Sequence, residues 1–174
     1  QALDGTLREP AGKWALLVKL RGQEWVALAG LWQDYDAAER LLTAAIADYE
    51  SVGDTPAAIR AGSKLCNVEW TVGRQVEALA RGQQLLEIAS TREPDERLAV
   101  LAATMGNAYF FAGNHERADE LLSLALDLGE SLGVPEAISR AFAGKGMRAM
   151  ARDHPEEALA YTKHGLTIAL DTED

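Results

Sequence analysis

The stretch MGNAYFFAGNHERA, residues 105–118, contains the end of one predicted helix, a polar turn and the start of another. Gly113 and Asn114 favour turns, and Ala118 is the first small apolar residue after them. Ala118 is also one of four alanines that stand 40 residues apart, at positions 38, 78, 118 and 158. A polar turn precedes each alanine, at residues 33–35, 73–75, 113–115 and 153–155. A fixed period of this length predicts a solenoid, in which each unit packs on its neighbours.

Other positions repeat with the same period. A large aliphatic residue follows each alanine by eight positions, and twelve positions before three of the alanines stand the small residues Cys66, Gly106 and Gly146. We expect each small residue to face the alanine where two helices cross closely, because only small side chains fit between backbones at short distance. The repeated alanines are therefore interpreted as packing residues.

The segments between the turns carry apolar residues at helical spacing. From Ala118 to Leu132 the apolar positions step by three and four, Gly133 can end that helix in the left-handed region, and Pro135 can begin the next. Asp95 is a natural N-cap for another helix. No segment shows a strand pattern, so the sequence predicts an all-α chain with about eight antiparallel helices, at 11–32, 35–52, 56–72, 75–91, 95–112, 115–132, 135–152 and 155–170.

Composition limits the classes of function. The chain has 174 residues and a formal net charge of −10, which disfavours binding to nucleic acid or to anionic lipid. No apolar run is long enough to span a membrane, and a cytoplasmic location is expected. The single cysteine, Cys66, is expected to be a buried apolar residue. Residues 1–10 are interpreted as the remnant of a longer protein, followed by one array over 11–174.

The 105–118 stretch resembles a tetratricopeptide repeat, in which a hydrophobic residue, Gly and Tyr precede a Gly-polar turn and then Ala. Residues 34–38 and 155–159 resemble the turn and second helix of the same motif. The period of 40 exceeds the usual 34 and is similar to the helical arrays of large bacterial signalling regulators. The resemblance implies a right-handed α-solenoid of four helix-turn-helix repeats, at about 15–54, 55–94, 95–134 and 135–174. A HEAT-like superhelix, whose period is also near 40, remains the alternative fold.

The resemblance weakens in the first two units. In the second unit Glu69 stands where the motif has tyrosine, and Gly82 stands where it has a large core residue. In the first unit Val26 replaces the glycine.

The resemblance also implies a binding site. In this family the first helix of each unit lines a concave groove, and Asn67 and Asn107 match the asparagine that can hydrogen-bond a peptide backbone. For the aromatic pair Trp70 and Phe110, core packing between units is an equally good interpretation. The full set of groove candidates is Arg60, Ser63, Asn67, Trp70, Asn107, Phe110, Phe111, Arg140, Met147 and Met150.

Catalysis finds little support in the sequence. His115 and His154 fall in predicted turns and His164 on the last helix, with no metal-binding spacing among them. We therefore expect no enzyme activity, no metal and no cofactor. The expected function is a protein- or peptide-binding scaffold within a larger bacterial regulatory protein. Two alternatives stay open: a small-molecule sensor, and self-association through the last helix, which carries Leu159, Leu166 and Leu170 on a different face from Ala158.

Overall fold

The computed structural model describes residues 35–171, and all regular structure in that part of the chain is helical. Each predicted boundary in this range lies within one residue of the observed one. The predicted helix at 11–32 and the residues before it lie outside the described residues, and the handedness and number of repeats stay predictions. The helices are α2 (Tyr35–Ser51), α3 (Thr55–Thr71), α4 (Gln75–Ser90), α5 (Glu96–Phe111), α6 (His115–Leu132), α7 (Pro135–Ala151) and α8 (Pro155–Leu170).

Five of the turns between helices share one backbone device. Their central residue has a positive φ, and these residues are spaced by 20 or 40 positions: Gly53, Gly73, Gly113, Gly133 and Asp153. After Gly113, the amide of Asn114 donates to the carbonyl of Tyr109 at 3.0 Å, and the other four turns make the equivalent bond. This bond closes a helix end of the Schellman type, which satisfies a carbonyl that the helix itself leaves free. These turns therefore set where α2, α3, α5, α6 and α7 end.

The α4–α5 connection uses a different device. The Asp95 side chain accepts hydrogen bonds from the backbone amides of Arg97 and Leu98, at 2.9 and 3.2 Å. The predicted N-cap is confirmed, and it satisfies two of the amides that begin α5.

Contacts divide the described chain into two compact units, residues 35–68 and 69–171, with the division inside α3. In the first unit, α2 packs on α3 through one hydrophobic core, in which alanines stand beside larger side chains. The buried side chains step by three and four along both helices, which is the spacing of one helix face. They are Ala38, Leu42, Ala45 and Tyr49 of α2 and Ala57, Ala58, Ala61, Leu65 and Val68 of α3.

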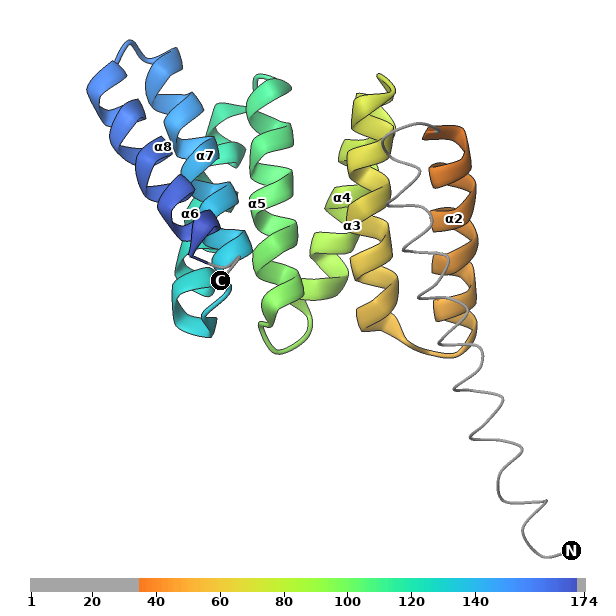
Figure 1. Cartoon of the computed structure of the whole chain (residues 1–174). Helices are drawn as coiled ribbons and strands as arrows, with labels where there is room; N and C mark the ends of the chain where they lie inside the picture. Colours follow the sequence, from red (N-terminus) through yellow and green to blue (C-terminus); the bar gives the residue numbers. More distant parts are fainter. Residues whose placement is uncertain (1–34, 172–174) are drawn as a thin grey trace, which may run out of the picture. The chain divides into compact units, whose positions relative to one another are not determined.

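In the second unit, α5 packs against α4, α6 and α7, while α7 also packs against α6 and α8 (Figure 1). α5 is the most enclosed of these helices, since every residue from Leu101 to Gly106 is buried.

The helix pairs approach closely at the positions that the sequence singled out. All four repeated alanines are buried. A Cβ at Gly106 would lie 2.8 Å from Cγ of Leu122 and 3.1 Å from the Leu122 backbone nitrogen. A Cβ at Gly146 would lie 3.3 Å from the carbonyl oxygen of Ala158. Gly146 therefore faces its repeated alanine, Ala158, as expected. Gly106 instead faces Leu122, which lies one helical turn after Ala118.

Two departures of the second repeat have a physical explanation. The Met105 side chain occupies the space that a Cβ at Gly82 would need, so α5 supplies the bulk that α4 lacks. Glu69 is buried and accepts hydrogen bonds from Nε and Nη2 of Arg81, the shortest at 2.8 Å. The pair compensates the charge that Glu69 brings into a position where Tyr109 stands one repeat later.

We expect Ala118→Leu to destabilise the protein by about 1–3 kcal/mol, because the fully buried alanine has no space beside it for three more carbons. Ala80→Leu, the same change at an exposed position of α4, is the control and should leave the melting temperature nearly unchanged. Urea unfolding followed by circular dichroism measures both. Equal stability of the two variants would contradict the close crossing.

Candidate functional site

Three of the predicted binding residues form an aromatic cluster in the second unit. The rings of Trp70 and Phe111 lie 6.3 Å apart, and those of Phe110 and Phe111 lie 5.2 Å apart in an edge-to-face arrangement. His115 extends the cluster, with its ring 5.6 Å from that of Phe110. Phe111 is 60% exposed, which is unusual for a phenylalanine that has aromatic neighbours to bury it. We call Trp70, Phe110 and Phe111 the aromatic cluster.

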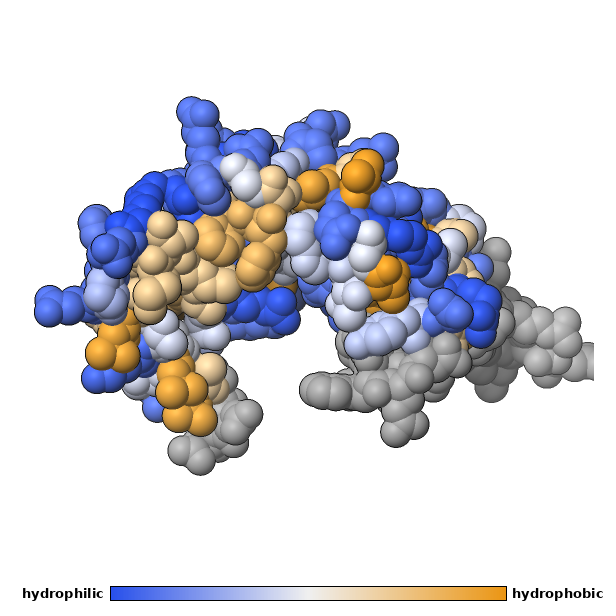
Figure 2. Space-filling view, turned by 90° about the horizontal axis from the view of Figure 1, so that it is seen from above, coloured by the Kyte–Doolittle hydropathy of each residue, from blue (hydrophilic) through white to orange (hydrophobic). Residues whose placement is uncertain are grey.

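Helix ends position this cluster. Trp70 stands in the last turn of α3, and Phe110 and Phe111 form the last turn of α5. Trp70 and Phe110 occupy equivalent places in successive repeats, but the contact with Trp70 runs through Phe111, one residue later. Figure 2 shows that hydrophobic side chains gather over one face of the second unit. Single exposed hydrophobic residues are common, whereas a packed and exposed aromatic group indicates a binding surface.

The Asn107 side chain lies between α5 and α7. Its Nδ2 donates to the carbonyl of Arg140 at 3.3 Å, and its Oδ1 lies against Gly144. That Oδ1 is buried and has no hydrogen-bond partner among the described residues. The amide therefore links α5 to α7.

The remaining candidates are distributed over α3 and α7. Arg140 pairs with Glu136 at 2.9 Å, within its own helix. Met147 is partly buried, while Met150 is 60% exposed at the position of α7 equivalent to Phe110. In the first unit, Asn67 is exposed and the other two candidates of α3, Arg60 and Ser63, are partly buried. Their steps of three and four residues place them on one face of α3.

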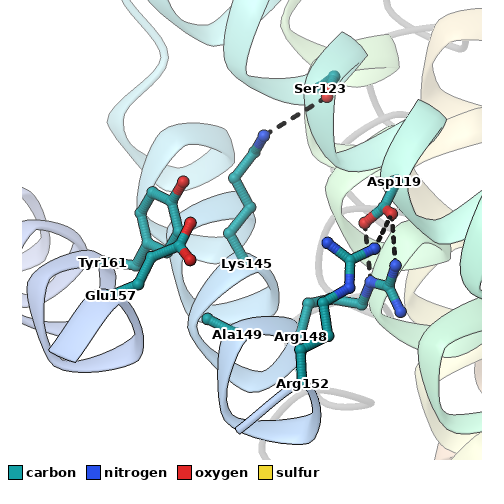
Figure 3. Close-up of a pocket in the computed structure, with 8 residues that line it drawn as sticks. All are labelled: Asp119, Ser123, Lys145, Arg148, Ala149, Arg152, Glu157 and Tyr161. Carbon is teal, nitrogen blue, oxygen red and sulfur yellow. Dashed lines mark hydrogen bonds and ion pairs between the residues drawn. The ribbon is translucent and has the colours of Figure 1, made fainter. Parts of the chain in front are cut away.

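A second site, which is polar, lies between α6, α7 and α8. It was not predicted from the sequence. A pocket of about 250 Å³ opens there, lined by side chains from all three helices (Figure 3). Lys145 and Arg148 of α7 line it together with Arg152, the C-cap residue that directly follows the helix, at spacings of three and four. Three basic residues at this spacing in an acidic chain could have indicated the site from the sequence. The remaining lining residues are Asp119, Ser123, Ala149, Glu157 and Tyr161.

Asp119 is the centre of the charges in this pocket. Arg148, only 5% exposed, donates from Nε to Oδ1 of Asp119 at 2.7 Å and from Nη2 to its Oδ2. Arg152 donates to the same Oδ2 at 2.9 Å. The Arg148 hydrogen bonds, followed by the charges of the two guanidinium groups, hold the pKa of Asp119 below its usual value although partial burial opposes this.

The other side of the pocket carries a carboxylate and a phenol. Glu157 hydrogen-bonds Tyr161 and so raises the pKa of the tyrosine, with burial and the carboxylate charge acting in the same direction. Glu157 also lies 3.3 Å from Nδ1 of His154. Glu157 and Tyr161 lie at the edge of the pocket, on the α8 side.

Three further findings concern metal binding, membrane spans and the cysteine. Within residues 35–171, no three His, Cys, Asp or Glu side chains come together in a metal-binding arrangement. None of the described helices is long and apolar enough to cross a membrane. Cys66 is buried, as expected.

Comparisons with known proteins give little beyond the structure itself. No protein-family model and no curated protein matches the chain. Among solved structures, the crystal structure of MamA is similar over 95% of both chains, with 16% sequence identity and a TM-score of 0.49. Similarity at this level carries no argument, so the assignment of the described residues to an all-α fold of consecutive helix-turn-helix pairs rests on their own helices and turns.

We expect Asp119→Asn to lower the stability by about 1–3 kcal/mol, because the buried Arg148 guanidinium loses its counter-charge. The loss should stay below the ~3–5 kcal/mol of a fully buried pair, since the Asp119 side chain is 44% exposed. Asp127→Asn, at an exposed position of the same helix, is the control. Urea unfolding near neutral pH measures both variants, and similar losses would contradict a special role for Asp119.

The same pair predicts a pH dependence. A folded-state pKa below the unfolded value of about 3.9 stabilises the fold above that value, and the stabilisation is lost as the pH falls through the folded pKa. The stability difference between wild type and Asp119→Asn should therefore be constant near neutral pH and shrink below about pH 4. Unfolding curves from pH 7 to pH 3 test this, and a difference that grows with acid would contradict it.

Proposed function

We propose that the chain is a non-catalytic binding module that holds an apolar segment of a protein or peptide on the aromatic cluster. The observation that carries the proposal is the exposure of Phe111 between the rings of Trp70 and Phe110. Aromatic side chains dominate the energetics of protein interfaces, and those held by neighbouring rings lose little conformational entropy on binding.

Two candidates on α7 fit a partner that is mainly apolar. Met150 offers an exposed and adaptable contact on α7, which packs against α5. Arg140 on the same helix, whose side chain is 42% exposed, offers a hydrogen-bond donor for a carboxylate or a carbonyl of the partner. Asn107 has no part in this proposal, because its amide is engaged with α7. The tetratricopeptide-like arrangement of helix pairs is consistent with a scaffold role inside a larger regulatory protein.

Peptides selected from a random library on the immobilised chain test the proposal. We expect the selected peptides to contain large apolar residues and to bind Phe111→Ser at least about tenfold more weakly, a loss of about 1.4 kcal/mol. The matched control is Ile88→Ser, which removes an exposed aliphatic side chain of α4 outside the aromatic cluster. Titration calorimetry gives the affinities.

Circular dichroism confirms that each variant is folded before binding is measured. Selected peptides that bind Phe111→Ser as tightly as the wild type would place the binding surface elsewhere. Equal losses in both variants would show a general surface effect and would equally contradict the proposal.

Self-association is the second candidate, and the exposed leucines of α8 favour it. Leu159, Leu166 and Leu170 are 54%, 56% and 55% exposed, whereas Ala158 and Gly165 on a different face are buried. Three half-exposed leucines on one helix present enough apolar side chain to pair with the same helix of a second copy.

Analytical ultracentrifugation at several concentrations measures this association. We expect the wild type to dimerise and Leu166→Glu to remain monomeric, because the glutamate would bury a charge in the interface. Ile88→Glu on α4 is the control and should dimerise normally. A wild type that stays monomeric at every concentration would contradict the second candidate.

A further inference from the structure

The pocket between α6, α7 and α8 has more positive than negative charge. Three cations line it, Lys145, Arg148 and Arg152, against the two carboxylates of Asp119 and Glu157. The formal local charge is therefore +1, in a chain whose net charge is −10. A cationic pocket in an acidic protein concentrates the field on small anions, while the rest of the surface repels large ones.

Each carboxylate in the pocket already has a partner within the protein. The single charge of Asp119 is shared by two guanidinium groups, so the Arg148–Arg152–Asp119 group retains one positive charge. Glu157 lies 3.3 Å from Nδ1 of His154, and its carboxylate raises the pKa of Tyr161. Neither carboxylate forms an ion pair with Lys145 in the described part of the chain.

Lys145 is the cation with the weakest partner. Its Nζ makes one hydrogen bond, to Oγ of Ser123, at 3.4 Å. Figure 3 shows its side chain between the Tyr161–Glu157 pair and the two arginines. An ammonium group has three donors, so Lys145 has capacity for an anion that the protein itself does not supply.

Arg152 supplies further donors at the same pocket. It binds Asp119 through Nη2 alone, and its side chain is 57% exposed. The fork of a guanidinium group can bind an oxyanion through the nitrogen atoms that remain. Arg148, buried and bound to Asp119 through two nitrogens, holds this arrangement in place.

We propose that this pocket binds a small organic oxyanion, with its carboxylate or phosphoryl group between Lys145 and Arg152. The volume of about 250 Å³ lies just below the ~300 Å³ at which sites for drug-sized ligands begin, so the ligand is the size of a small metabolite. Ala149 and the Tyr161 ring provide an apolar wall for its carbon atoms. This site shares no residue with the aromatic cluster and does not depend on the function proposed for it.

Titration calorimetry of the whole chain at low ionic strength tests the site, with inorganic phosphate and succinate as separate probes. We expect the better probe to bind the wild type and to bind the double variant Lys145→Gln, Arg152→Gln at least about tenfold more weakly. Lys163→Gln, which removes an exposed cation of α8 outside the pocket, is the control and should bind as the wild type does. Added salt should weaken the binding.

A second variant separates the loss of the site from a loss of folding. Glu157→Gln removes a negative charge from the lining of the pocket. This charge would repel a bound anion, so we expect the variant to bind the probe a few fold more tightly. A folding defect cannot produce that gain. Preference between phosphate and succinate identifies which oxyanion the site takes. Failure of both probes to bind the wild type, an unaffected double variant, or weaker binding by Glu157→Gln would each overturn the proposal.

Discussion

The close approach of paired helices is the constraint on which the second unit depends. Gly106 of α5 lies against the Leu122 backbone, and Gly146 of α7 lies against the carbonyl of Ala158. At these distances even a methyl group would displace the neighbouring helix, so the small residues determine how α5 sits on α6 and α7 on α8. The aromatic cluster and the cationic pocket are both built on helices held in this way.

The turns add a second constraint, which is on the length of the helices. Left-handed residues spaced by multiples of 20 positions end the helices at regular intervals. Equivalent residues of successive repeats therefore stand at the same distance from the end of their helix, as Trp70 does in α3 and Phe110 in α5. This places Trp70 and Phe110 at matching helix ends, where the additional ring of Phe111 joins them in one group.

The second unit contains two ion pairs in which one partner is buried, a carboxylate in the first and a guanidinium in the other. At the start of the unit a buried carboxylate, Glu69, is paired with the partly exposed Arg81. Further along, a buried guanidinium, Arg148, is paired with the half-exposed Asp119. Both arrangements compensate a charge that desolvation would otherwise make costly. Only the second leaves an excess of cations beside an open pocket, since Lys145 of α7 and Arg152, just beyond its last residue, line that pocket as well.

Seven helices, α2 to α8, could be predicted from the sequence, since helical spacing and left-handed turn residues act within short segments and the 40-residue period repeats them. The sequence also determined the buried alanines and the cap at Asp95. Tertiary structure decided which side chains meet between helices: that Asn107 binds the Arg140 carbonyl, that Met105 fills the space beside Gly82, and that Asp119 reaches two arginines about thirty residues away. The period fixes the face on which a residue stands, but a contact across two helices depends on their separation and on side-chain direction, which packing sets.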